Sequence, residues 1–306
     1  MTTLIAGATG LIGQRIVEKL IAARHEVVIL TRNPSKLSAP GPPPLRFVRW
    51  DARTPGEWYR ELNQADAVVN LSGESIGGRR WTTAQKDRIR SSRINATKAI
   101  VEAIAASPKK PRVLVNASGI DYYGETRDEE VVESHPGGSG FLADVCRQWE
   151  TAARVGERFG VRVVLARSAV VLGARAAALK KLILPFRFLL GGPLGTGDQW
   201  FPWIHLEDEA EAILFAIDNS ALAGPVNLTA PQPLTMRQFC RFLGNALKRP
   251  SWISVPPLLL RLALGEMSDM VLMSRRVVPR RLLDAGYRFR FPRLDEALAD
   301  VLSRER

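Results

Sequence analysis

Three glycines near the start of the chain, Gly7, Gly10 and Gly13, stand between an apolar run at residues 3–6 and a helical pattern of apolar residues. A helix that begins at such a turn offers unpaired backbone N–H groups and the positive end of its dipole, and both favour a bound anion. Glycine allows the tight turn, close backbone approach to phosphate, and close packing of helix on strand. This order predicts a dinucleotide-binding unit rather than a glycine-rich turn without a ligand. The residues expected to hold the pyrophosphate are Gly7, Thr9, Gly10, Leu11, Ile12 and Gly13.

The tip of the second apolar run, residues 27–30, indicates which dinucleotide is bound. An acid at this position would bind the ribose 2′-hydroxyl of NAD, whereas a cation accommodates the 2′-phosphate of NADP. The run ends in Thr31 and Arg32, with no acid. The planar guanidinium of Arg32 suits phosphate, and a hydroxyl of Thr31 or Ser35 would add a hydrogen bond. The sequence therefore favours NADP over NAD, unless Arg32 is only a solvated loop residue.

A parallel sheet must position these groups, and the first half of the chain alternates apolar strand-like runs with helical patterns. Such alternation predicts an α/β fold, a Rossmann-type doubly wound parallel sheet with helices on both faces. Further strands are expected at residues 47–50, 67–71, 113–117 and 161–166. Helices are expected at about residues 83–105 and 142–157, with Gly160 as a stop.

The alternation weakens after residue 170, which predicts a second, smaller lobe. A late strand at residues 225–229 is expected to return to the main sheet, and Thr235 is expected to cap a helix over residues 235–247. We therefore expect a dinucleotide-binding domain at residues 1–169 and 204–230. The C-terminal substrate-binding lobe would comprise residues 170–203 and 231–306.

The formal net charge is +12, which is compatible with nucleic acid, an anionic membrane surface, or an anionic cofactor and substrate. Basic residues are spread along the whole chain without a recognised nucleic-acid motif, which disfavours nucleic acid. The apolar stretches are too short to span a bilayer, so no membrane partner is expected. The first strand leaves no room for a secretory leader, and the two cysteines form no framework, so a cytoplasmic location is expected. Three widely separated histidines predict no metal site.

Several motifs together resemble the extended short-chain dehydrogenase/reductase superfamily, and within it an atypical epimerase-family subgroup, NAD-dependent epimerase/dehydratase-like, whose substrate is uncharacterised. They cover nearly the whole chain, and their combination is more specific than any one of them. The motifs are Gly7-Ala8-Thr9-Gly10-Leu11-Ile12-Gly13, Asn70-Leu71-Ser72-Gly73-Glu74, Arg80-Trp81, Ser92-Arg93, Tyr122-Tyr123-Gly124, Arg167-Ser168, Val171-Leu172-Gly173, Gly191-Gly192-Pro193, Phe201-Pro202-Trp203-Ile204-His205 and Gly286-Tyr287-Arg288-Phe289-Arg290-Phe291-Pro292.

The resemblance implies further cofactor contacts. Asp51 would lie by the adenine, where its carboxylate or backbone accepts from the exocyclic amine; a solvated loop carboxylate is the equal alternative. Leu71, Ser72 and Gly73 would form a turn past the cofactor ribose, or only a strand-end turn. Arg93, on the following helix, would face the cofactor or its phosphates.

The superfamily's hydride chemistry uses a tyrosine and a lysine four positions later, so that the ammonium lowers the pKa of the phenol. This sequence lacks that pair: the two positions fall at or near Leu142 and Cys146. Ser118 matches the serine that hydrogen-bonds a substrate carbonyl in the superfamily. Tyr122 and Tyr123 follow in a loop, where one would serve as general acid if its pKa fell; packing under the lobe interface is the alternative. The candidate catalytic residues are therefore Ser118, Tyr122 and Tyr123.

Two functions follow from these observations. The first is an NADP-dependent oxidoreductase or epimerase-like enzyme, with an atypical active site, acting on a small anionic molecule held between the lobes. The second is a non-catalytic NADP-binding sensor or scaffold, which the missing tyrosine and lysine favour. His205 is expected to pack or act as a hinge rather than catalyse. The substrate, the direction of reaction and the role of the C-terminal arginines stay open, and so does a homodimer.

Overall fold

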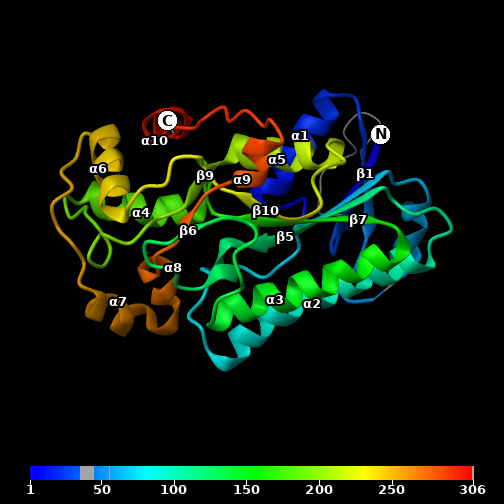
Figure 1. Ribbon diagram of the computed structural model, residues 1–306, viewed down its shortest axis with the longest axis horizontal. Helices are drawn as coiled ribbons and strands as arrows, with labels where there is room; N and C mark the ends of the chain where they lie inside the picture. The colour runs from blue at the N-terminus through cyan, green and yellow to red at the C-terminus, as the bar shows by residue number, and fades with distance from the viewer. Residues whose placement is uncertain (35–44, 55, 305–306) are drawn as a thin grey trace.

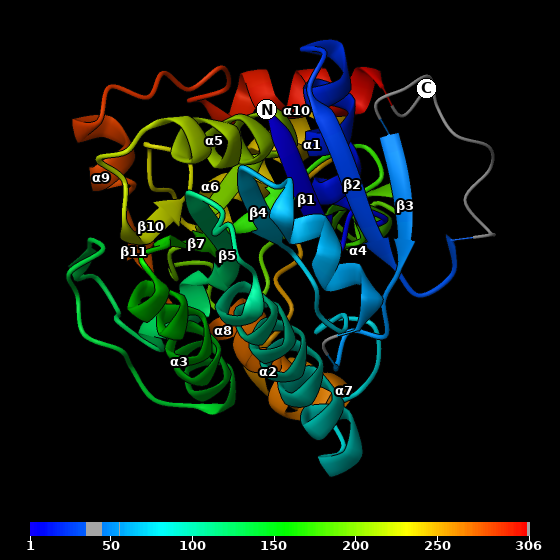
Figure 2. The ribbon, with the colours of Figure 1, turned by 90° about the vertical axis from the view of Figure 1, so that its right-hand side faces the viewer.

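The computed structural model describes residues 1–34, 45–54 and 56–304. Its centre is a seven-stranded parallel sheet (Figure 1). The strands follow one another in the order β10-β7-β5-β4-β1-β2-β3, which can be traced in Figure 2. This confirms the predicted Rossmann-type doubly wound sheet. The strands are β1 (Thr2–Ala6), β2 (Glu26–Thr31), β3 (Leu45–Arg49), β4 (Ala67–Asn70), β5 (Val113–Gly119), β7 (Arg162–Ser168) and β10 (Gly224–Leu228).

Helices cover both faces of this sheet (Figure 2). On one face lie α1 (Leu11–Ala22) and α5 (Leu206–Asp218), and on the other lie α2 (Thr83–Ala106) and α3 (Phe141–Arg154). Each face of the sheet has its own apolar core, and alternate residues of β1 point into one or the other. Ile5 packs in the core under α1 and α5, and Leu4 packs in the core under α2 and α3. Strands buried on both faces are almost continuously apolar, which is why the sequence pattern revealed them.

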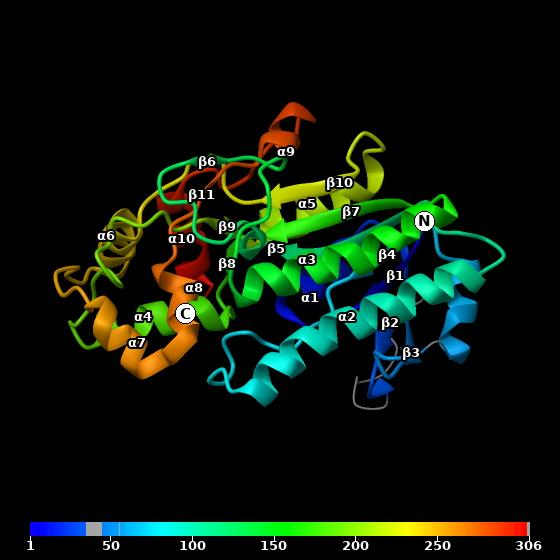
Figure 3. The same cartoon turned by 60° about the horizontal axis from the view of Figure 1, so that its bottom comes forward.

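A third apolar core belongs to the C-terminal lobe. It joins β8 (Val170–Leu172), β9 (Trp203–His205), α4 (Ala177–Arg187), α6 (Met236–Leu247) and α10 (Leu294–Ser303). Figures 1 and 3 place α4, α6 and α7 (Pro257–Leu264) together at one end of the molecule. The remaining elements are η2 (Glu57–Asn63), η3 (Ile120–Tyr123), β6 (Glu130–Val131), η4 (Val155–Phe159), η5 (Gly265–Ser268), α8 (Asp269–Leu272), β11 (Arg276–Val277) and α9 (Arg280–Asp284).

Several local signals in the sequence have their expected structural counterparts. β10 returns to the main sheet beside β7, Thr235 caps α6 in a capping box with Gln238, and Gly160 ends η4 with a left-handed φ of 77°. The boundaries of the two domains stay a prediction. Within the described ranges, no helix is both long enough and apolar enough to cross a membrane.

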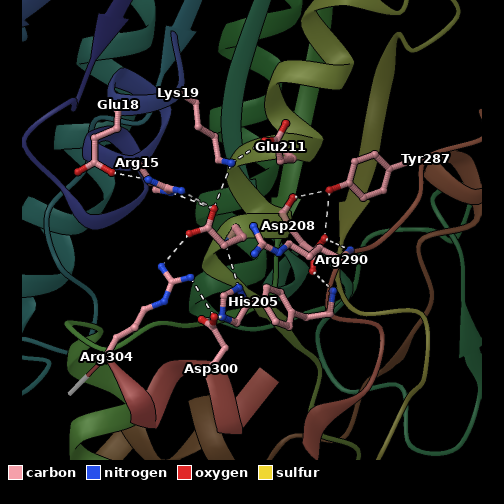
Figure 4. Close-up of polar contacts among 12 residues, drawn as sticks. Arg15, Glu18, Lys19, His205, Asp208, Glu211, Tyr287, Arg290, Asp300 and Arg304 are labelled. Atoms are coloured by element: carbon pink, nitrogen blue, oxygen red, sulfur yellow. Dashed lines mark hydrogen bonds and ion pairs between the residues drawn. The ribbon is translucent and has the colours of Figure 1, made fainter. Parts of the chain in front are cut away.

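Three consecutive acids open α5, and all three are buried. Glu207 accepts a hydrogen bond from Arg15 Nε of α1 at 2.9 Å and pairs with Lys19 Nζ at 3.1 Å (Figure 4). From the C-terminal tail, Arg304 Nη1 reaches the same carboxylate at 3.2 Å. Burial opposes ionisation of Glu207, but the hydrogen bonds from Arg15 and Lys19 outweigh it and lower its pKa to about 2. This carboxylate therefore ties α1, α5 and the tail together.

The second acid, Asp208, folds the tail back onto α5. Its carboxylate accepts the backbone N–H of Arg290 at 2.7 Å and that of Phe291 at 2.9 Å (Figure 4). His205 precedes the helix as its N-cap, and its Nδ1 accepts the backbone N–H of Glu207 at 3.1 Å. Burial lowers the pKa of His205 to about 4, so the imidazole is neutral at neutral pH. This arrangement agrees with the packing role expected for His205.

The third acid, Glu209, is fully buried. Ser168 Oγ, at the end of β7, donates to its Oε1 at 2.5 Å, and Oε2 has no hydrogen-bond partner among the described residues. Burial raises the pKa of Glu209 to about 8. The folded chain therefore holds this carboxyl group mostly protonated at neutral pH.

We expect Glu209→Gln to raise the free energy of unfolding by more than about 1 kcal/mol at pH 8. The pKa of Glu209 is about 8 in the folded chain and about 4.3 in an unfolded one. The folded state therefore keeps a proton that the unfolded state releases, and the contribution of this group to stability falls as pH rises between these values. Urea unfolding at several pH values in this window measures the effect. The matched control is Glu102→Gln on the exposed face of α2, and an equal change of pH slope in both variants would contradict the assignment.

Candidate functional site

The turn after β1 has the shape of an anion cradle. Gly7 adopts a φ of +83°, and a Cβ there would lie 2.7 Å from the backbone carbonyl of Leu71. A Cβ at Gly13 would lie 2.5 Å from the backbone oxygen of Gly7. α1 begins after Gly10 with no side-chain cap and no acid in its first turn, so its first N–H groups remain open to an anion. Thr9 and Gly10 are exposed, and Leu11 and Ile12 are half-buried.

The tip of β2 presents Arg32, which is exposed and makes no ion pair with another described residue. Thr31 Oγ1 accepts the backbone N–H of Asn33 at 3.4 Å, so this hydroxyl shapes the turn that carries Arg32. Ser35 lies outside the described residues. The open N–H groups of the cradle and the exposed guanidinium of Arg32 leave room for anions at both places, and their contacts with a pyrophosphate and a 2′-phosphate stay predictions.

Asp51, after β3, is exposed and serves its own turn. Its carboxylate accepts the backbone N–H groups of Thr54 and Arg53, each at 2.9 Å, and the Thr54 hydroxyl at 2.7 Å. The hydrogen bonds from Thr54 and then Arg53 lower the pKa of Asp51. A local role therefore accounts for this carboxylate, and its contact with adenine stays a prediction.

A buried polar network fixes the turn after β4. Asn70 Nδ2 donates to Asn116 Oδ1 at 2.7 Å and to Thr97 Oγ1 at 2.9 Å, while Asn70 Oδ1 accepts the backbone N–H of Ser72 at 3.2 Å. The indole of Trp149 also donates to Thr97, at 2.9 Å. The turn of Leu71, Ser72 and Gly73 is thus held from α2, β5 and α3 at once, beside Gly7 of the cradle.

Arg93, on α2, packs against the turn formed by Leu71, Ser72 and Gly73. A Cβ at Gly73 would lie 3.0 Å from the Arg93 guanidinium carbon, which leaves little space for any other residue there. Arg93 Nη1 donates to the backbone oxygens of Glu74 at 2.9 Å and Ile89 at 3.0 Å, and the guanidinium lies 5.1 Å from the Trp149 ring centroid. Burial lowers the pKa of Arg93. These contacts position the turn, and a direct contact between Arg93 and the cofactor stays a prediction.

Ser118 lies at the end of β5, but its hydroxyl already has a partner. Ser118 Oγ donates to Glu150 Oε1 of α3 at 2.7 Å. The buried Glu150 carboxylate also accepts two hydrogen bonds from Arg167 of β7, at 2.8 and 2.9 Å. The proton of Ser118 is therefore directed at Glu150, and a contact between Ser118 and a substrate carbonyl stays a prediction.

The two candidate tyrosines differ in their surroundings. Tyr123 is buried, donates to Asn227 Oδ1 at 2.6 Å and accepts from Arg167 Nη1 at 2.9 Å. Burial raises its pKa to about 12, whereas a general acid at this site required a lowered pKa. Tyr122 is half-buried with its ring centroid 3.5 Å from the Arg167 guanidinium carbon, and its hydroxyl makes no hydrogen bond within the described chain. The surroundings of Tyr123 are those of a packed residue, and a catalytic role for Tyr122 stays a prediction.

A cavity of about 110 Å³ lies between the start of α3 and the segment from η5 to β11. Leu142, at the position expected for the superfamily tyrosine, lines it. One turn later Cys146 is buried, and burial raises its thiol pKa to about 12. Asp121 and Arg275 line the cavity as an ion pair at 3.2 Å. Its other lining residues are Trp81, Gly124, Ser139, Gly140, Phe141, Ala143, Glu266, Asp269, Met270 and Met273.

Sequence reasoning missed Glu150 and the cavity. One feature of the sequence could have indicated Glu150: it lies at helical spacing from Cys146 and Ala153, on the buried side of α3. Because an acid on such a stripe needs a buried partner, that position pointed toward a cation such as Arg167. The cavity had no local signal, because its walls lie more than a hundred residues apart.

Comparisons with known proteins agree with this geometry. Residues 3–228 match the NAD dependent epimerase/dehydratase family, and residues 255–301 match a domain of unknown function, DUF1731. The epimerase family protein YfhF of Bacillus subtilis is 37% identical over 306 residues, covering 99% of this chain and 98% of its own. The chloroplastic epimerase family protein SDR39U1 homolog of Arabidopsis thaliana is 39% identical over 304 residues, covering 99% of this chain and 87% of its own.

Among solved structures, the human epimerase family protein SDR39U1 (isoform 2), crystallised with NADPH, superimposes with a TM-score of 0.86. It is 34% identical, and the match covers 99% of each chain. The family match covers most of the chain and agrees with the resemblance that the motifs indicated. This chain belongs to the NAD dependent epimerase/dehydratase family.

Proposed function

We propose that this protein binds NADP(H) at the carboxyl ends of β1, β2 and β4 and acts as an oxidoreductase or epimerase on a small molecule. The anion cradle carries the proposal: glycines at Gly7 and Gly13 leave no room for a side chain, and the start of α1 is uncapped. Arg32 at the tip of β2 favours the 2′-phosphate. The human relative crystallised with NADPH supports the same choice of cofactor.

The chain's residues would divide the work around the bound dinucleotide, which supplies hydride chemistry when it is present. The cradle holds the pyrophosphate, and the turn after β4 orients the adjoining ribose. The cavity beside α3 would hold the substrate, with Trp81, Phe141, Met270 and Met273 excluding water. Tyr122 Oη, free of protein partners within the described chain, is the candidate for moving a proton. The net charge of +12 favours an anionic substrate, although the lining Arg275 is engaged with Asp121.

A second function, a non-catalytic NADP-binding sensor, has its own support. The hydroxyls of Ser118 and Tyr123 are committed to Glu150 and Asn227, and Leu142 stands where the superfamily acid is expected. On this alternative the cavity binds a ligand without turnover.

We expect Arg32→Ala to weaken NADPH binding by about tenfold or more, because a charge-assisted hydrogen bond contributes about 1.5–3 kcal/mol. NADH, which has no 2′-phosphate, should bind as before. Calorimetric titration of both nucleotides measures the change. Arg60→Ala, at another exposed arginine of the same domain, is the control. An unchanged preference between the two nucleotides in Arg32→Ala, or no binding of either to the parent chain, would refute the proposal.

We expect Tyr122→Phe to reduce turnover by about a hundredfold or more, because a general acid contributes about 10²–10⁴, and to leave NADPH affinity unchanged. Oxidation of NADPH across a panel of carbonyl compounds and nucleotide sugars provides the assay. Tyr59→Phe, at a half-buried tyrosine of η2, is the control. Full activity in Tyr122→Phe would exclude Tyr122 as the acid. NADPH binding without turnover on any substrate of the panel would favour the sensor.

A further inference from the structure

Large apolar side chains gather on one part of the surface. Ten of them are at least 40% exposed in the described chain, and all but Leu283 come from two segments, residues 184–190 and 252–262. The most exposed are Trp252 at 70%, Phe188 at 69% and Leu258 at 67%. We call these nine residues the apolar face: Leu184, Phe188, Leu189, Leu190, Trp252, Ile253, Leu258, Leu259 and Leu262.

The two segments form one continuous surface. Gly191 O accepts the backbone N–H groups of Trp252 at 3.0 Å and Ile253 at 3.2 Å, and Pro193 O accepts that of Val255 at 2.9 Å. The Trp252 indole donates to the backbone oxygen of Leu189 at 2.8 Å. These bonds join the end of α4 to the segment that leads into α7, and Figure 3 shows the two helices at the same end of the molecule.

Helix α7 contributes little to the interior of the protein. Five of its eight residues are leucine, yet among them only Leu260 is buried. Lys181 and Leu184 of α4 and Phe188, its C-cap, are all exposed and follow at helical spacing. Monomeric proteins rarely leave a contiguous apolar surface of this kind uncovered, so the face is expected to meet a partner.

The two stretches of sequence that build the apolar face carry charge of a single sign. The sequence contains no Asp or Glu between residues 158 and 197 or between residues 219 and 265, the stretches that build the face. The cations of α4 and α7 are Lys180, Lys181, Arg187 and Arg261. A hollow of about 160 Å³ at the end of α7 is lined by Arg79, Arg80 and Lys181 together with Gly77, Gly78, Ala263, Leu264 and Met267.

We propose that the apolar face docks on an anionic lipid bilayer, with leucine, phenylalanine and tryptophan side chains entering the interface and the surrounding cations meeting lipid phosphates. Large apolar residues flanked by Lys and Arg are the pattern of helices that lie in a membrane surface. A second copy of the chain would bring the same cations to the same contact, and like charges repel. Nucleic acid would use the cations but leave the leucines without an apolar partner.

This docking is peripheral and needs no spanning helix, since α7 has only eight residues. It differs from the sequence-based expectation of no membrane partner, which rested on the absence of a spanning stretch, and it agrees with the anionic membrane surface that the net charge of +12 left open. It is independent of the proposed cofactor chemistry, so the failure of one leaves the other standing.

Co-sedimentation of the full chain with lipid vesicles tests the proposal. We expect binding to vesicles of phosphatidylcholine and phosphatidylglycerol in equal amounts to be at least about tenfold tighter than to phosphatidylcholine alone, and to weaken with salt. The double variant Phe188→Ala with Trp252→Ala should lose most of this binding. Leu283→Ala, at the exposed apolar residue outside the face, should retain it.

A second pair of variants distinguishes the effect of where the cations lie from the effect of the net charge of the chain. Lys180→Glu with Arg261→Glu should reduce binding to anionic vesicles by about tenfold or more. Arg24→Glu with Arg60→Glu changes the net charge equally, at exposed sites on the sheet domain, and should have a much smaller effect. Circular dichroism checks that each variant is folded. Equal losses in the two pairs, no vesicle binding by the parent chain, or a concentration-dependent dimer that the Phe188 and Trp252 changes abolish would each overturn the proposal.

Discussion

The burial of three consecutive carboxyl groups at the start of α5 is the constraint on which the two lobes depend. These three side chains come from one helical turn and contact three different parts of the chain. Glu207 contacts α1, Asp208 contacts the C-terminal tail, and Glu209 contacts the end of β7. α1 is the helix whose start forms the anion cradle, and the tail carries α10 into the core of the second lobe. The cradle and the C-terminal lobe are therefore connected through a single helix.

A second buried charge pair determines which hydroxyls remain available for chemistry. Glu150 and Arg167 join α3 to β7, and removing one partner of such a pair leaves an uncompensated charge at a cost of about 3–5 kcal/mol. Their hydrogen bonds also engage Ser118 and Tyr123. Tyr122 packs against the same guanidinium with its hydroxyl outside the network, so the pair leaves one candidate acid near the cavity.

The apolar face and the cavity are consecutive along the chain. α7 ends at Leu264, and η5 and α8, which follow at once, supply Glu266, Asp269 and Met270 to the cavity wall. A surface that docks α7 would thus lie close in sequence to the wall of the substrate site. Sparse burial of α7 contrasts with the dense core between α4, α6 and α10, to which α7 contributes no residue.

The sequence alone determined the doubly wound sheet and the glycine turn after β1, because these depend on local features: apolar runs buried on both faces and glycines that a close approach requires. It did not predict α4 or α7 as helices, since Pro185 lies inside one and α7 buries only Leu260. It also did not reveal that the hydroxyls of Ser118 and Tyr123 donate to Glu150 and Asn227. Only the tertiary structure decided these, because whether a hydroxyl is free depends on the partners that strands and helices distant in sequence bring within hydrogen-bond distance.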